Sequence, residues 1–262
     1  MANLTTNAVV DRVLEEATAF AHENSGDPGM SHTFGYFTDH PVARLNRERL
    51  TMTLREIAER ATEGARLLDM GCGGGLFTAA FAAAGYRVAG VDLAPEEIAR
   101  ARRFAERMNV TPALLVGDLQ AEGWMTEVEE ALGGRPQVVF YGYCLHHLPD
   151  VPSHLRALGE WLPPGSIVVV NEENPRSPSW FLKNAVRSVI QRDTKEEHQL
   201  SHKRWSGLLV AAGFEPVGDL RGADLLPGVP VGMRWSQVFS YEKGGGLKGI
   251  NDASRGCGPA TN

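Results

Sequence analysis

The stretch LLDMGCGGG, residues 67–75, decides the fold of this chain of 262 residues. An apolar run ends in Asp69, and four glycines follow within residues 71–75. Glycine lets the backbone turn sharply and lets a ligand approach the main chain, while the helix that follows offers free N–H groups. The stretch therefore predicts a parallel strand whose carboxyl end opens into a ligand-binding turn and a helix.

The spacing of the glycines separates the ligand classes that use such a turn. A dinucleotide fingerprint needs a glycine or alanine three residues after the second glycine, and that position falls on Leu76 when counted from Gly71 and on Thr78 when counted from Gly73. No GKS or GKT follows a glycine after four spacer residues. The spacing thus disfavours a nicotinamide dehydrogenase and a P-loop phosphate site.

Short apolar runs alternate with helical segments on both sides of this turn. Such alternation is typical of βαβ crossovers, which give an α/β fold with a mostly parallel sheet and helices on both faces. We expect seven strands, within 65–71, 86–93, 113–118, 137–143, 166–173, 214–220 and 235–243, and helices near 76–84, 95–108, 123–132, 151–161 and 203–212.

The pattern predicts three parts of the chain. Residues 1–62 form an N-terminal helical cap or lid segment with helices near 4–24 and 41–62, and residues 63–243 form the core, with an insert at about 175–202. The stretch 244–262 is rich in glycine and poor in apolar residues, so we expect a disordered tail.

Composition and charge exclude several classes of protein. With 43% hydrophobic and 22% charged residues the chain has an ordinary globular composition, and no window approaches the roughly 18 apolar residues of a membrane span. The net charge is −6, and the basic stretch 100–107 is interleaved with glutamates, so we expect no nucleic-acid partner and no membrane. The first residues lack the pattern of a secretion signal, which favours a cytoplasmic protein.

Cysteine usage argues against metal and disulfide frameworks. Cys72, Cys144 and Cys257 are far apart and lack CxxC spacing. We expect neither a structural zinc site nor any other metal.

Asp69, Gly71, Gly73 and Gly75 form the pattern acid-x-Gly-x-Gly-x-Gly. The pattern resembles the first motif of the class I S-adenosylmethionine-dependent methyltransferases. Further acids close the second and third expected strands in VAGVDLAP and LLVGDLQ, and the stretches YGYCLHHLPD and LPPGSIVVV extend the resemblance over most of residues 45–242. The resemblance implies a Rossmann-like sheet and S-adenosyl-L-methionine as the cofactor.

The resemblance also implies roles for single residues. Asp69 would contact the amino group of the methionine part, Asp92 the ribose hydroxyls and Asp118 the adenine amino group, although Asp92 would also serve as a helix cap. The cofactor-binding set that we expect is Asp69, Gly71, Cys72, Gly73, Gly75, Asp92, Leu93, Asp118, Leu119 and Tyr141.

Candidate catalytic residues follow the fourth expected strand. Tyr143, His146 and His147 lie where this family holds the methyl group, and imidazole titrates near neutral pH, so it could take a proton from the acceptor. The alternative is that the HHL turn only packs and starts the next helix. Methyl transfer from a sulfonium needs alignment, exclusion of water and often a base, but no covalent protein nucleophile and no metal.

Acceptor contacts are expected from the pieces around the common core. Aromatic walls with few polar points suit a medium-sized organic acceptor, although each aromatic could equally be part of the core. Glu172 and Glu173 follow the fifth strand, where a solvated turn is the alternative, and His198 could instead lie on the surface. The candidate acceptor residues are Tyr36, Phe37, Glu172, Glu173, Trp180 and His198.

The sequence thus predicts a methyltransferase acting at O, N or C of a small organic acceptor, such as a secondary metabolite or a quinone-like compound. The alternative is a protein that binds S-adenosylmethionine and assists a cyclisation or rearrangement without methylating, because the motif reports binding and not turnover. A small molecule is the expected partner, and a homodimer remains open.

Overall fold

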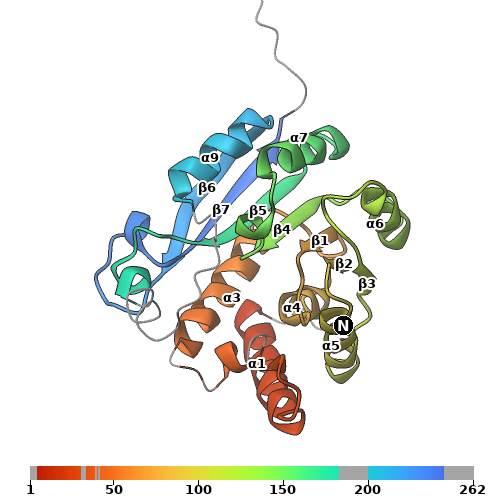
Figure 1. The fold of residues 1–262 in the computed structure, drawn as a ribbon, viewed down its shortest axis with the longest axis vertical. Coiled ribbons are helices and arrows are strands. Elements are labelled where there is room, and N and C mark those ends of the chain that lie inside the picture. The colour runs from red at the N-terminus through yellow and green to blue at the C-terminus, as the bar shows by residue number, and fades with distance from the viewer. Residues whose placement is uncertain (1–4, 31–33, 39, 41, 183–199, 245–262) are drawn as a thin grey trace, which may run out of the picture.

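A computed structural model describes residues 5–30, 34–38, 40, 42–182 and 200–244 (Figure 1). Its centre is a sheet of seven strands in the order β3-β2-β1-β4-β5-β7-β6. The strands are β1 (Arg66–Met70), β2 (Arg87–Asp92), β3 (Ala113–Val116), β4 (Val138–Gly142), β5 (Ile167–Glu173), β6 (Phe214–Ala223) and β7 (Ser236–Lys243). Pairing from β3 to β5 is parallel, and β7 runs antiparallel to both β5 and β6. The predicted mostly parallel α/β sheet is confirmed.

Helices cover both faces of the sheet, so the molecule has three layers (Figure 1). The helices α1 (Thr6–Glu23), α3 (Ala43–Ala58), α4 (Leu76–Ala83) and α5 (Pro95–Arg107) share one side, and α6 (Trp124–Leu132), α7 (Val151–Trp161) and α9 (His202–Ala211) cover the other. Short 3₁₀ turns lie at η1 (Gly35–Phe37), η2 (Leu145–His147) and η3 (Val231–Met233).

Side chains alternate between the two cores along the central strands β1, β4 and β5. Leu67 and Phe140 belong to the core that contains α1, α3 and α4, while their neighbours Leu68 and Tyr141 belong to the core beneath α6, α7 and α9. Because successive side chains of a strand point to opposite faces, a strand covered on both faces must be apolar throughout. This explains the continuous apolar runs of the sequence.

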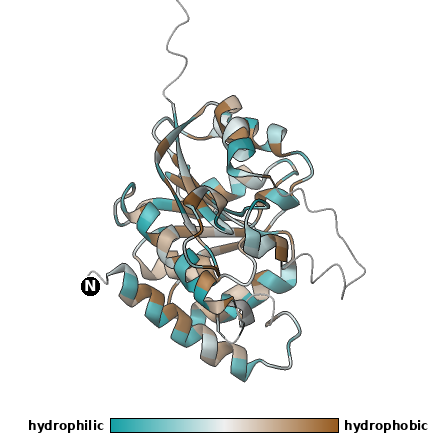
Figure 2. Cartoon of the chain, turned by 90° about the vertical axis from the view of Figure 1, so that its left-hand side faces the viewer, coloured by the Kyte–Doolittle hydropathy of each residue, from teal (hydrophilic) through white to brown (hydrophobic). Residues whose placement is uncertain are grey.

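The N-terminal helices pack into the same core as the sheet. In Figure 2 the helix that starts at the N label shows alternating brown and teal bands, the mark of an amphipathic helix. Phe20 of α1 stacks edge-on against Phe34 at 5.1 Å between ring centroids, and Phe34 packs on Phe104 of α5 at 4.7 Å. The division of the chain after residue 62 remains a prediction, and the two parts share one hydrophobic cluster.

The carboxyl ends of β1, β2, β4 and β5 lie at one edge of the sheet. The register pairs Met70 of β1 with Tyr141 of β4, and Gly142 of β4 with Asn171 of β5. Helix α3 packs against β5, β6 and β7 and thus lies beside this edge. None of the helices in the described ranges is long and apolar enough to cross a membrane.

Candidate active site

The loop after β1 is held in a shape that requires glycine. Gly71 has φ +64°, and a Cβ there would lie 2.6 Å from the sulfur of Cys144. Gly73 has φ +51°, but the space beyond its Cα is open. The backbone at Gly73 is therefore exposed to a ligand, as expected of a cofactor cradle.

Asp69 is a buried acid beneath this loop. Its side chain is 2% exposed, and the hydroxyl of Thr78 in α4 donates a hydrogen bond to Oδ2 at 2.5 Å. Burial raises the pKa of Asp69 to about 7, although the Thr78 hydrogen bond and the charge of Arg49 act against the rise. Such a carboxylate gains stability from a cationic ligand, so Asp69 fits a site for the amino end of S-adenosylmethionine.

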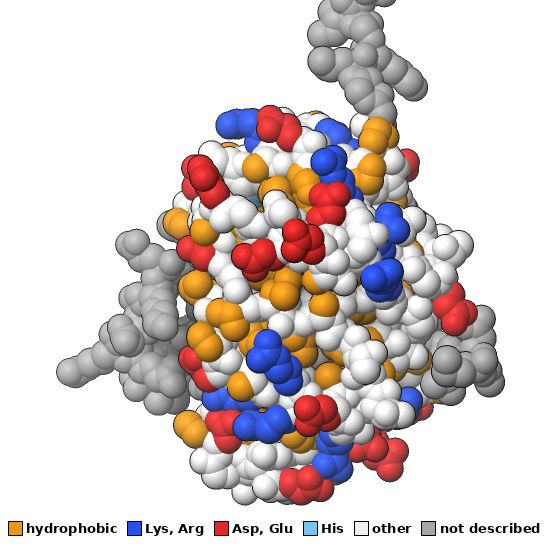
Figure 3. Space-filling model, turned by 90° about the vertical axis from the view of Figure 1, so that its right-hand side faces the viewer, with side chains coloured by type: hydrophobic (Ala, Val, Ile, Leu, Met, Phe, Trp, Pro, Cys, Tyr) orange, Lys and Arg blue, Asp and Glu red, His pale blue; other side chains and the backbone are white. Residues whose placement is uncertain are grey.

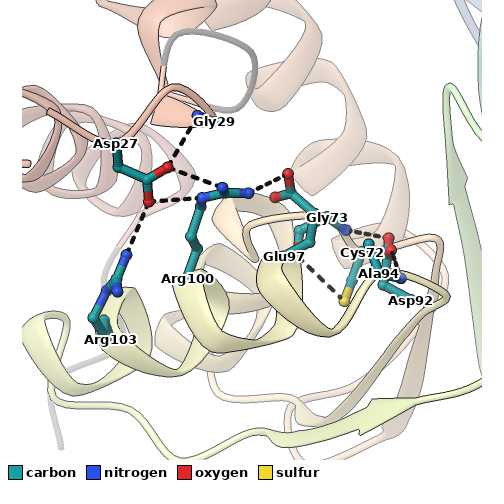
Figure 4. Close-up of polar contacts among 9 residues, drawn as sticks. All are labelled: Asp27, Gly29, Cys72, Gly73, Asp92, Ala94, Glu97, Arg100 and Arg103. Carbon is teal, nitrogen blue, oxygen red and sulfur yellow. Dashed lines mark hydrogen bonds and ion pairs between the residues drawn. The ribbon is translucent and has the colours of Figure 1, made fainter. Parts of the chain in front are cut away.

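Asp92, the last residue of β2, ties the glycine loop to the start of α5 (Figure 4). Its Oδ2 accepts from the N–H of Gly73 at 2.8 Å, and its Oδ1 accepts from the N–H of Ala94 at 2.9 Å. A carboxylate oxygen has two acceptor positions, so both oxygens can accept one more donor, such as a ribose hydroxyl. The capping role and the expected ligand role are thus compatible.

The carboxyl ends of β2 and β3 present an apolar surface beside Asp92. Leu93 is 68% exposed and Val116 is 46% exposed. Asp118 accepts from the N–H of Gln120 at 2.8 Å, and the side chain of Leu119 is buried. An exposed leucine followed along the sheet edge by an exposed acid suits an adenine ring with an amino group, although this assignment remains a proposal.

A cavity of about 850 Å³ opens between the glycine loop, the end of β4 and helix α3. A medium-sized organic molecule fits this volume. Its walls are mostly apolar or aromatic, with a few polar side chains. Among the residues expected at the site, the cavity is lined by Phe37, Asp69, Gly71, Cys72, Gly73, Tyr143 and Glu173.

Arg49 of α3 is a cavity residue that the sequence analysis did not select. Its side chain is 7% exposed, and its guanidinium carbon lies 3.9 Å from the centroid of the Tyr143 ring and 4.8 Å from that of Phe77. Arg49 follows the buried Leu45 by four residues and precedes the buried Thr53 by four. An arginine on the apolar stripe of a helix was therefore a signal present in the sequence.

Tyr143 stands at the end of β4 with an unusual backbone. Its φ is +56°, which is rare for a residue other than glycine, and its N–H donates to the carbonyl of Asn171 at 2.8 Å. Burial raises the pKa of the phenol to about 12, although Arg49 acts against the rise. A phenol with this pKa is protonated at neutral pH, which argues against Tyr143 as the base.

His146 and Glu172, expected as a base and an acceptor contact, form a buried pair that does not line the cavity. Oε2 of Glu172 lies 2.6 Å from Nδ1 of His146, and Oε1 accepts from the N–H groups of Cys144 and Leu145 at 3.1 and 2.8 Å. Both side chains are less than a tenth exposed. Their position indicates that the two side chains stabilise the turn after β4 and argues against direct contact with the acceptor.

The remaining expected residues are placed as follows. Tyr141 is buried on the far face of the sheet, where its hydroxyl lies 2.7 Å from Nε2 of His154, so its position argues against cofactor contact. His147 is exposed, and Trp180 donates to Oε2 of Glu173 at 2.9 Å and packs near Trp235. Gly75 caps α4 with φ +80°. His198 and the side chain of Tyr36 lie outside the described residues.

On the face shown in Figure 3, charges of both signs are mixed. In the view of Figure 3 the Lys and Arg side chains are interspersed with Asp and Glu, with no patch of one sign. Within the described ranges, no three or more His, Cys, Asp or Glu side chains are grouped so that they could hold a metal ion.

Known proteins with similar sequences are methyltransferases, in agreement with the geometry of this site. Residues 42–217 match the family model described as a methyltransferase domain. The ubiquinone biosynthesis O-methyltransferase of Ruegeria pomeroyi is 29% identical over 82% of this chain and 92% of its own length. The enzyme of the same name from Cereibacter sphaeroides is 30% identical over 75% of this chain and 81% of its own length.

A solved structure shares the fold at low sequence identity. Magnesium protoporphyrin IX methyltransferase from Synechocystis, solved with bound SAH, superposes with a TM-score of 0.55 at 15% identity, over 74% of this chain and 81% of that one. At this identity the likeness concerns the arrangement of helices and strands alone.

Proposed function

The chain belongs to the methyltransferase-domain family of class I S-adenosylmethionine-dependent methyltransferases, and on that premise we propose that it methylates a hydroxyl oxygen of a small, largely apolar organic acceptor. S-adenosylmethionine is the methyl donor, and when bound it supplies a methyl group on a positively charged sulfur. The observation that carries the proposal is the mostly apolar cavity of about 850 Å³ that opens onto the glycine loop.

The choice of oxygen as the methylated atom is based on the names of the relatives. Two of them are named as O-methyltransferases, and they cover most of this chain. The expectation of a quinone-like or secondary-metabolite acceptor is compatible with the aromatic walls formed by Phe37, Phe77 and Phe140. Methylation of nitrogen or carbon is the outcome that product analysis would separate from this one.

We further propose that the cofactor is held along the sheet edge. Asp69 would take the ammonium group, the backbone at Gly73 would lie against the methionine part, and Asp92 would bind the ribose. The open space at Gly73 and the buried carboxylate of Asp69 support this orientation. The Tyr143 side chain would then border the acceptor half of the cavity and help to exclude water.

Location and assembly also belong to the proposal. We propose that the enzyme works in the cytoplasm on a small molecule and without nucleic acid. The mixed charges on the face shown in Figure 3 favour the absence of a nucleic-acid partner. A homodimer stays open, and light scattering of the purified protein would decide its oligomeric state.

The proposal is tested by following the methyl group. Purified protein is incubated with S-adenosylmethionine labelled in the methyl carbon and with matched sets of phenols, amines and activated carbon acids. We expect label in an aryl methyl ether, identified by mass spectrometry and by the carbon shift of the new methyl group. Label only on nitrogen or carbon would overturn oxygen as the accepting atom. Cofactor consumed without any labelled product would favour the non-methylating alternative.

A further inference from the structure

Arg49 places a buried positive charge in the wall of the acceptor cavity. Its Nε has no hydrogen-bond partner among the residues that the structure describes, and its Nη1 donates to Oδ1 of Asn46 at 3.4 Å. Burial lowers the pKa of the guanidinium, although Tyr143, Glu173 and Glu172 act against the fall. A buried, incompletely paired guanidinium is costly, so it gains from an anion in the cavity.

The groups around Arg49 are aromatic rings and carboxylates that already serve other donors. The rings of Phe37, Phe77 and Tyr143 lie 5.5, 4.8 and 3.9 Å from the guanidinium carbon and stabilise the cation, and the Tyr143 side chain also favours its charged form through a hydrogen bond.

Each carboxylate whose charge acts on Arg49 has a donor of its own. Glu172 binds the turn after β4, and Glu173 accepts from Trp180. The third carboxylate, Asp69, accepts from Thr78. A ligand is thus the remaining candidate for the open Nε position.

We infer that Arg49 is the counter-ion of the acceptor's nucleophilic oxygen, so that the acceptor is a weakly acidic hydroxyl compound, such as a phenol or an enol, that reacts as its oxyanion. The inference rests on the proposed function. It makes Arg49 a catalytic residue and removes the need for a side-chain base, in keeping with the position of His146 outside the cavity wall.

The step balances with the groups present. The acceptor hydroxyl gives its proton to bulk water as it binds beside Arg49. Its oxygen lone pair then forms the bond to the methyl carbon, while the electron pair of the broken carbon–sulfur bond stays on sulfur. The negative oxygen and the positive sulfur are neutralised together. An opposite charge within about 4–6 Å lowers the pKa of an acid by about 1–3 units, which is enough to ionise a large share of an ordinary phenol near pH 8.

The first test measures ionisation without turnover. 4-Nitrophenol absorbs visible light strongly only as its phenolate, so a pH titration of its absorbance in the presence of excess wild-type protein and S-adenosylhomocysteine reports the ionisation of the bound ring. We expect its pKa to fall by at least about one unit, equal to a tenfold shift of the ionisation equilibrium. A bound ring that titrates at or above the free value, or failure to bind as the phenolate, overturns the inference.

Variants assign the shift to Arg49. Arg49→Gln should abolish it and Arg49→Lys should retain part of it, because only lysine keeps the charge. Arg55→Gln, on the exposed side of α3, is the matched control and should leave the shift intact. If Arg49→Gln does not fold, the wild-type titration still shows whether the pKa of the bound ring falls, and Arg49→Lys still tests whether Arg49 causes the fall.

Two anions could pair with Arg49, namely the oxygen of the acceptor and the carboxylate of the cofactor. Calorimetry with S-adenosylhomocysteine distinguishes between them. We expect less than a twofold change in its affinity in Arg49→Gln. A loss of tenfold or more, with the nitrophenol shift unchanged, would mean that Arg49 pairs with the carboxylate of the cofactor, and the inference would fall. No methyl transfer at all, with the nitrophenol shift present, would refute the proposed function and leave the anion site standing.

Discussion

Asp92 has a structural role in its hydrogen bonds, and we propose that the same side chain also binds the cofactor. It accepts hydrogen bonds from the N–H groups of Gly73 and Ala94, so its loss should loosen the glycine loop as well as remove the proposed acceptors for the ribose. We expect Asp92→Ala to weaken binding of S-adenosylhomocysteine by about 1.5–3 kcal/mol, the range of charge-assisted hydrogen bonds. Titration calorimetry measures this loss, and Glu160→Gln, on the exposed side of α7, serves as the control. Unchanged affinity would remove Asp92 from the site.

Asp69 should make cofactor binding depend on pH. Its pKa of about 7 in the free protein lies above the ordinary value of 3.8 for an aspartate, so the carboxyl is mostly protonated below pH 7, and ionising it there costs free energy. A cationic ligand pulls it into the ionised form, so binding should release a proton, and affinity should rise with pH up to about 7 and then level off.

Between pH 5.5 and 7.5 we expect an increase in S-adenosylmethionine affinity of roughly twentyfold, measured by calorimetry in two buffers with different heats of ionisation. Asp69→Asn should bind weakly and without this pH dependence. If the affinity of Asp69→Asn depended on pH as strongly as that of the wild type, the group that titrates would not be Asp69.

At the scale of elements, the turn after β4 depends on one buried carboxylate from β5. The carboxylate of Glu172 accepts from two backbone N–H groups and contacts the ring of His146. In Glu172→Gln only one side-chain oxygen remains to accept from these three groups. We expect a loss of about 2–4 kcal/mol in the free energy of unfolding, the range for breaking a buried, hydrogen-bonded carboxylate.

The same variant should affect turnover more than cofactor affinity, because Tyr143, next to this turn, lines the cavity that we propose for the acceptor. Denaturant unfolding and the labelling assay measure the two effects, again with Glu160→Gln as the control. Stability equal to that of the wild type would show that the turn does not need Glu172.

The sequence predicted these elements well but not their contacts. The strands and the loop at Asp69 follow from local patterns, namely apolar runs and glycines at fixed spacing. The pairing of Glu172 with His146 depends on the order of strands in the sheet, and Arg49 reaches the cavity only because α3 crosses beside that edge. Such contacts arise from tertiary packing, which single-sequence periodicity does not encode.

At the scale of the whole molecule, α5 links the N-terminal segment to the edge of the sheet at Asp92, where we propose that the cofactor binds (Figure 4). The guanidinium of Arg100 donates two hydrogen bonds of 2.9 Å to Asp27 and pairs with Glu97 at 2.6 Å, and Arg103 also donates to Asp27 at 3.2 Å. Helix α5 begins three residues after Asp92, so one element touches both regions. We therefore expect Arg100→Gln to loosen the N-terminal segment without unfolding the sheet.

Hydrogen exchange with mass spectrometry tests this link. In Arg100→Gln the amides of α1 should exchange faster by about tenfold or more, while those of β1 and β4 stay protected, because the sheet keeps its own core. Arg102→Gln, on the same helix but bonded to the carbonyl of Leu114, is the control and should leave α1 unchanged. High salt should reproduce only a small part of the effect in the wild type, since the half-exposed Arg103 is screened more strongly than the largely buried Arg100. Unaltered exchange of α1 in Arg100→Gln would mean that apolar packing alone holds the N-terminal segment.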